Sequence, residues 1–79
     1  MSLTEDIADE LAKKTMVIIG GTDDNELVND VATAIGASSA TLQEAYLTAM
    51  RIRRAENRAF VILDKFEKDG PKKKSSAAT

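Results

Sequence analysis

The chain has 79 residues, a formal net charge of −2 and a hydrophobic fraction of 43%. A chain of this length forms one domain whose core is marginal for an isolated monomer, which favours oligomerisation. Cysteine, histidine and tryptophan are absent, so disulfides, thiolate nucleophiles and the commonest general base and transition-metal ligand are excluded.

These absences predict a protein that is not an enzyme, with no catalytic residues, no cofactor and no metal site. The pI of about 5.0 does not favour a nucleic-acid partner. The acidic N-terminal stretch has no apolar core of signal-peptide length, and the longest apolar run, residues 16–19, is too short to cross a bilayer. We therefore expect a cytoplasmic protein without membrane contact.

The first predicted helix covers residues 4–19. Thr4 or Ser2 can cap its N-terminus, the acidic residues of its first turns suit the helix dipole, and Gly20-Gly21 ends it. Residues 15–21 also resemble a strand that enters a phosphate-binding glycine loop, but no second strand and no P-loop lysine accompany them. The expected buried face consists of Ile7, Ala8, Leu11, Ala12, Thr15, Ile18 and Ile19.

The second predicted helix covers residues 24–35. Asp23 and Glu26 have the spacing of a capping box, and Gly36 is expected to stop the helix. The spacing of its apolar residues predicts a buried face made of Leu27, Val28, Val31, Ala32 and Ile35.

The third predicted helix is long and covers residues 39–69. Thr41 and Glu44 form a second capping-box pattern, Ser38 and Ser39 are competing caps, and Gly70-Pro71 is a strong stop signal. At about 1.5 Å per residue this helix would be a rod of about 43 Å. Residues 1–70 would thus form a single helical domain, and residues 71–79 a disordered, lysine-rich tail.

The apolar residues of this long helix predict self-association. Residues 60–63 are apolar on nearly every side of the helix, and two short neighbours could hardly surround it along its whole length. The main apolar stripe is Leu42, Ala45, Ala49, Ile52, Ala59, Leu63 and Phe66, and a second partial stripe is Tyr46, Met50 and Val61. We therefore predict an all-α fold of two short helices packed on one long C-terminal helix, forming a homodimer through Ile52, Glu56, Phe60, Leu63 and Phe66, with Glu56 meeting an arginine across the dimer seam.

Residues 28–46 carry one motif with a functional meaning. Ala32 is the small residue where two helices cross, Gly36 makes the turn with its freedom to adopt positive φ, and Ser38 follows as a helix cap. Four apolar residues would lock the helices together: Val31, Ile35, Leu42 and Ala45. This pattern resembles the helix-turn-helix of DNA-binding repressors, particularly the lactose-repressor class.

The resemblance implies nucleic-acid contacts on the exposed face of the long helix. Ser39 and Gln43 lie near its start, and Gln43 suits adenine. No cation lies in the first two turns; Arg51, Arg54 and Arg58 come later, sharing one face. These arginines could bind phosphate, or they could pair with the carboxylates of the first two helices and set the register between helices.

Two functions therefore remain open. The leading hypothesis is a small, non-catalytic helical interaction or regulatory protein that acts as a homo-oligomer, with itself and an unknown protein as partners. The alternative is a dimeric helix-turn-helix transcriptional regulator that binds DNA.

Overall fold

Three α-helices make up the part of the chain that the structure describes, and that part contains no strand. The structure is a computed structural model that describes residues 2–20, 22 and 24–69. Helix α1 spans Leu3–Ile19, α2 spans Asn25–Gly36 and α3 spans Ala40–Asp69. Because α1 and α2 both pack on α3, the predicted all-α arrangement of two short helices on one long helix is confirmed. Each predicted helix boundary differs from the observed one by at most one residue.

Local sequence signals define both ends of α1. Ser2 Oγ accepts a hydrogen bond from the backbone N–H of Glu5 at 3.1 Å, and the Glu5 carboxylate accepts one from the Ser2 N–H at 3.4 Å. Ser2, one of the two predicted caps, therefore closes a capping box. Gly20 ends the helix with φ of 64°, a conformation that glycine adopts without a Cβ clash. Gly21 lies outside the described residues.

The cap of α2 differs from the predicted one. The carboxylate of Asp24 accepts hydrogen bonds from the backbone N–H groups of Glu26 and Leu27, at 3.1 and 3.3 Å. Asp24 is therefore the N-cap, whereas Asp23, which we expected in this role, lies outside the described residues.

The predicted capping box at the start of α3 is wrong. Ser39 Oγ accepts from the Leu42 N–H at 3.0 Å, so Ser39 is the cap and Thr41 lies inside the first turn. Ser39 and Thr41 could both cap α3, and capping by Ser39 makes the helix about half a turn longer.

The expected role of Gly36 is also wrong. Gly20 is the only described residue with positive φ, and Gly36 is the last helical residue of α2. A Cβ on Gly36 would lie 2.5 Å from the side-chain nitrogen of Gln43. Glycine at this position therefore makes room for a side chain of α3.

The core lies where α1 crosses the first half of α3. Its seven buried apolar residues are Ala8, Ala12, Ile19, Val28, Ala32, Tyr46 and Met50. The small side chains of α1 and α2 let the helices approach closely, and the two large residues from α3 fill the centre. Thr15 is buried with them, and its hydroxyl lies 2.9 Å from that of Tyr46.

One part of the predicted core is wrong. Ile7 and Ile18, expected on the buried face of α1, are 39% and 63% exposed. On α3 two residues of the second stripe, Tyr46 and Met50, are buried in the core, and the main stripe contributes partly buried residues beside them: Leu42, Ala45 and Ala49. Ile52, expected in the dimer interface, is 62% exposed. Aromatic and thioether side chains fill more volume than alanines do, so they determine which side of α3 faces α1 and α2.

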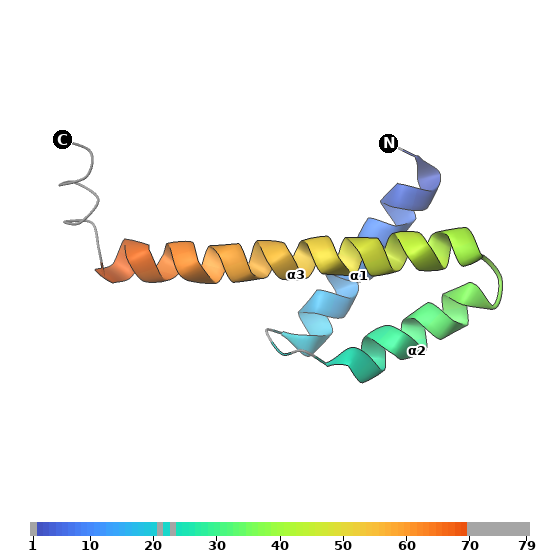
Figure 1. Ribbon diagram of the computed structural model, residues 1–79, viewed down its shortest axis with the longest axis horizontal. Helices are drawn as coiled ribbons and strands as arrows, with labels where there is room; N and C mark the ends of the chain where they lie inside the picture. The colour runs from blue at the N-terminus through green and yellow to red at the C-terminus, as the bar shows by residue number, and fades with distance from the viewer. Residues whose placement is uncertain (1, 21, 23, 70–79) are drawn as a thin grey trace.

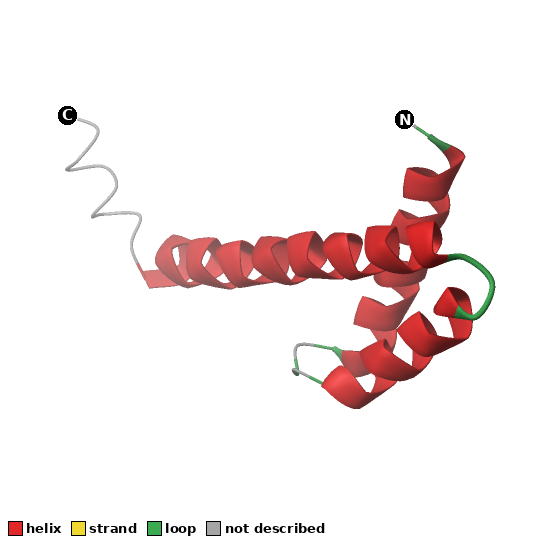
Figure 2. Cartoon of the chain, turned by 45° about the vertical axis from the view of Figure 1, so that its right-hand side comes forward, coloured by secondary structure: helices red, strands yellow, loops and turns green. Residues whose placement is uncertain are grey.

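The arrangement places no short helix beside the end of α3. Helix α1 crosses α3 steeply, and α2 folds back beside the start of α3 (Figure 1). Beyond this crossing α3 continues alone, with neither short helix beside it in either view (Figure 2). We call residues 55–69 the distal half of α3.

Candidate functional site

Exposed large apolar side chains are concentrated on the distal half of α3. Phe60, Val61, Ile62, Leu63 and Phe66 are each between 55% and 59% exposed. Single exposed apolar residues are ordinary, but five within seven positions of one helix form an apolar patch that runs around the helix. Such patches mark sites of association in soluble proteins.

The predicted dimer residues are distributed along this surface. Ile52, Leu63 and Phe66 lie on one side of α3, because their spacing matches the helical repeat. Phe60 lies next to that side, and Val61 lies on the opposite side although it is as exposed as Leu63. The predicted dimer face is therefore the side of α3 with Leu63 and Phe66, and Val61 lies on the opposite side.

An ion-pair network stands between this patch and the core. The guanidinium of Arg53 donates two hydrogen bonds to the Asp9 carboxylate of α1, at 2.9 and 2.8 Å. It donates a third to Glu56 at 3.0 Å, one turn along α3. We expected Glu56 to meet an arginine across a dimer seam, and the arginine it meets belongs to its own chain.

The network affects the titration of both partners. The hydrogen bonds from Arg53 lower the pKa of Asp9 below its ordinary value of 3.8, against the opposing effect of desolvation. The same contacts raise the pKa of Arg53. Sequence reasoning missed this pair, although Arg53 follows Tyr46 and Met50 at helical spacing and so had to face α1.

The three arginines of the alternative reading differ in their surroundings. Arg54 donates to the Asn25 side chain of α2 at 3.0 Å, not to one of the carboxylates that we expected there. Its Nε and Nη2 atoms are buried and have no hydrogen-bond partner in the described part of the chain. Arg51 and Arg58 are exposed.

The two polar residues expected to contact DNA bases hold the fold together. Ser39 caps α3, and the Gln43 amide donates to the backbone carbonyl of Ala32 in α2 at 2.9 Å. Both side chains are half-buried rather than on an exposed face. Ser39 thus stabilises the start of α3, and Gln43 links α3 to α2.

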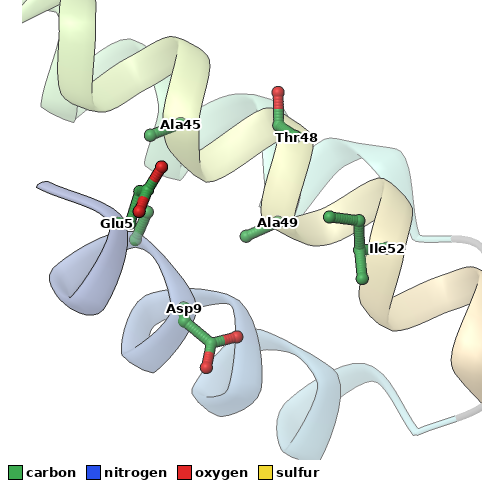
Figure 3. Close-up of a pocket in the computed structure, with 7 residues that line it drawn as sticks. Glu5, Asp9, Ala45, Thr48, Ala49 and Ile52 are labelled. Atoms are coloured by element: carbon green, nitrogen blue, oxygen red, sulfur yellow. The ribbon is translucent and has the colours of Figure 1, made fainter. Parts of the chain in front are cut away.

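A groove of about 460 Å³ lies on the side of the crossing nearer the start of α3. Small and apolar residues of α3 form its floor, and Glu5 and Asp9 of α1 point along its edge (Figure 3). Its complete lining is Glu5, Ala8, Asp9, Ala45, Thr48, Ala49 and Ile52. Among the described residues no three acidic side chains are close enough together to hold a metal ion.

A second groove, of about 400 Å³, lies on the other side of the crossing and opens toward the distal half of α3. It combines apolar side chains with the Arg53–Glu56 pair: Lys13, Met16, Val17, Arg53, Glu56, Asn57 and Phe60. Val17 is 79% exposed, so the apolar surface of α3 continues through this groove onto α1.

No helix in the described part of the chain is long and apolar enough to cross a membrane. A comparison with models of protein families gives no match, and comparisons with curated proteins and with solved structures give none either.

Proposed function

We propose that this chain is a small, non-catalytic interaction protein with a regulatory role, and that it associates through the distal half of α3. The observation that carries this proposal is the apolar patch at residues 60–66, whose five large apolar side chains are each more than half exposed. Exposing so much apolar surface to water is unfavourable by about 25 cal/mol per Å², which association would recover.

A second copy of the chain is the first partner to consider. Every copy presents the same face, and closed twofold dimers are the commonest assembly of such chains. The core supports this choice because its side chains are mostly alanine or valine, which bury little area for each ordered residue.

Sedimentation equilibrium at micromolar concentration tests the proposal directly. We expect the unaltered chain to be a dimer and Leu63→Asp to be a monomer. Val61→Asp is the matched control, because Val61 is equally exposed on the other side of α3 and should leave the dimer intact. A folded monomer for the unaltered chain would refute self-association, and equal disruption by both substitutions would refute the assignment of the face.

A helix-turn-helix DNA-binding regulator is the second candidate. It is supported by the short connection between α2 and α3 and by the exposed side chain of Arg51. The internal contacts of Ser39 and Gln43 weigh against it, because neither side chain is free to read a base.

Fluorescence anisotropy with a labelled random-sequence duplex separates the two candidates. DNA binding by this surface should weaken with salt, and Arg51→Ala should reduce the salt slope by about one. Arg51 is exposed, so its removal should not disturb the core. If no binding is seen at low salt, the DNA-binding candidate is refuted, and the connection between α2 and α3 serves only to pack the two helices together.

A further inference from the structure

The geometry points to a parallel, two-stranded coiled coil in which α3 of one copy packs in register along α3 of a second copy, from Ala45 to Phe66. This inference rests on the proposed self-association and adds the direction of the partner helix and the length of the contact. Three observations on α3 support it: a heptad repeat, the side of the helix that carries the repeat, and the charges that flank it.

Uncharged residues recur along α3 with the alternating spacing of three and four that is typical of a coiled coil. Each heptad of a coiled coil has two positions, a and d, that face the partner helix. Position a is taken by Ala45, Ile52, Ala59 and Phe66, and position d by Thr48, Ala55 and Ile62. The repeat therefore runs for three heptads without a charged residue at a or d, and we call these seven residues the seam.

The seam lies on the side of α3 that points away from the core. Tyr46 and Met50 are buried. Thr48 and Ile52 each come two residues later, and two residues turn a helix by about 200°. The seam begins beside α1, and the Thr48 side chain points away from α1 there (Figure 3). Further along, Ile52 and Ile62 are 62% and 58% exposed. The short helices of both copies would therefore lie on the outside of the dimer and leave the seam open to a partner.

The charges beside the seam determine the direction of the partner helix. Positions g and e flank a seam on its two sides, and in a parallel pair a residue at g meets the residue five places later, at e, on the partner. Arg51 is at position g and Glu56 is at position e, so each copy places Arg51 beside the partner's Glu56. The twofold axis produces two such pairs in the dimer.

Glu56 can accept this second arginine in addition to its own. Its Oε1 atom accepts a hydrogen bond from Arg53 of its own chain at 3.0 Å, but its side chain is 48% exposed, and a carboxylate has two acceptor oxygens. Arg51 is also exposed. An antiparallel partner would instead bring position g against position g, where three of the four residues are cations: Arg51, Arg58 and Lys65. Like charges in such contact oppose pairing.

Cysteine cross-linking tests the direction of pairing, because the chain contains no cysteine of its own. We would oxidise Thr48→Cys and Ala55→Cys separately, with Val61→Cys as the control on the opposite side of α3. In the parallel dimer each seam cysteine meets its own copy, so both variants should cross-link at least about tenfold more than the control. In any antiparallel dimer at least one of the two pairs lies about 10 Å or more apart along the axis, beyond the limit of about 7 Å between Cα atoms for a disulfide.

The outcomes separate failure of the direction from failure of the proposed function. A dimer in which either seam variant cross-links no better than Val61→Cys refutes the parallel seam and leaves self-association standing. An unaltered chain that sediments as a monomer refutes self-association itself.

Charge reversal at position g gives an independent measurement. Arg51→Glu would set a carboxylate beside Glu56 of the partner subunit, so we expect the dissociation constant of the dimer to rise about tenfold at low salt and the difference to shrink as salt is added. In an antiparallel pair the same substitution would place an anion among cations and tighten the dimer. A tighter or unchanged dimer, measured by sedimentation, would therefore overturn the parallel arrangement.

Discussion

At the scale of single residues, the buried hydroxyl pair of Thr15 and Tyr46 links the two helices that form the core. Thr15 Oγ1 donates its hydrogen to the Leu11 carbonyl at 2.8 Å, so it has no hydrogen left for Tyr46. The Tyr46 hydroxyl must therefore donate to Thr15 Oγ1, 2.9 Å away. The tyrosine O–H is therefore satisfied only while Thr15 is present, whereas the Thr15 O–H keeps its acceptor without Tyr46.

This direction of donation predicts unequal costs for two substitutions. Tyr46→Phe removes a donor and leaves the Thr15–Leu11 bond intact, so it should cost about 1 kcal/mol of unfolding free energy. Thr15→Val leaves the tyrosine O–H buried without an acceptor and should cost more, about 1–3 kcal/mol. Urea unfolding measures both, and the double variant should cost less than the sum. Equal single costs would contradict the assigned direction.

The pair of Asp9 and Arg53 makes stability depend on pH. Because Arg53 lowers the pKa of Asp9, the ionised carboxylate stabilises the fold at pH values above 3.8, and this contribution is lost as pH falls through the lower, folded-state value. We expect Asp9→Asn to melt below the unaltered chain at neutral pH and the difference to vanish in strong acid. Thermal melts at several pH values measure this. The difference should be small and shrink with added salt, because the pair is accessible to solvent.

At the scale of helices, the junction of α2 and α3 depends on the absence of a side chain at Gly36. Gly36 leaves room for the Gln43 amide, which bonds to Ala32 in the preceding turn of α2. Glycine disfavours helix by roughly 0.5–1 kcal/mol relative to alanine. The amide contact between helices offsets that cost.

Because Gly36 and Gln43 share this space, the effect of Gly36→Ala on stability should depend on whether Gln43 is present. Gly36→Ala alone should displace the Gln43 amide and bring little or no gain in stability. In the Gln43→Ala background, where the space is empty, the same substitution should stabilise the fold by about 0.5–1 kcal/mol. A double-mutant cycle in urea gives both numbers, and the same effect in both backgrounds would show that the two residues do not compete for space.

Sequence patterns predicted the helices well because caps and breakers are local. Ser2 and Gly20 act on their own turns, so no knowledge of the partner helix was needed. The buried face of α3 was harder to predict, because two stripes were available and packing chose the one with Tyr46 and Met50. Gly36 was misread for the same reason, since its role depends on a side chain from another helix.

At the scale of the whole molecule, the chain is elongated, with extents of 54 × 27 × 13 Å, and neither short helix lies beside the end of α3 beyond the crossing. A helix of about 15 residues is marginal in water on its own. Association of the distal half would therefore stabilise the helix as well as bury the patch.

This coupling predicts that the melting temperature depends on protein concentration. If only the dimer buries the patch, raising the concentration a hundredfold should favour the folded state by about 2.7 kcal/mol per mole of dimer. Calorimetry from micromolar to submillimolar concentration measures the shift, and Leu63→Asp should abolish it. A melting temperature that is constant over this range would contradict coupled folding and association.

The fully buried Tyr46 also has a spectroscopic consequence. It is the chain's single tyrosine, and no tryptophan is present. Near-ultraviolet emission therefore originates at the crossing of α1 and α3 and reports on the core alone, whereas far-ultraviolet circular dichroism sums over all three helices. The two signals will coincide on heating if the molecule unfolds as one unit. They will separate if the distal half of α3 frays first.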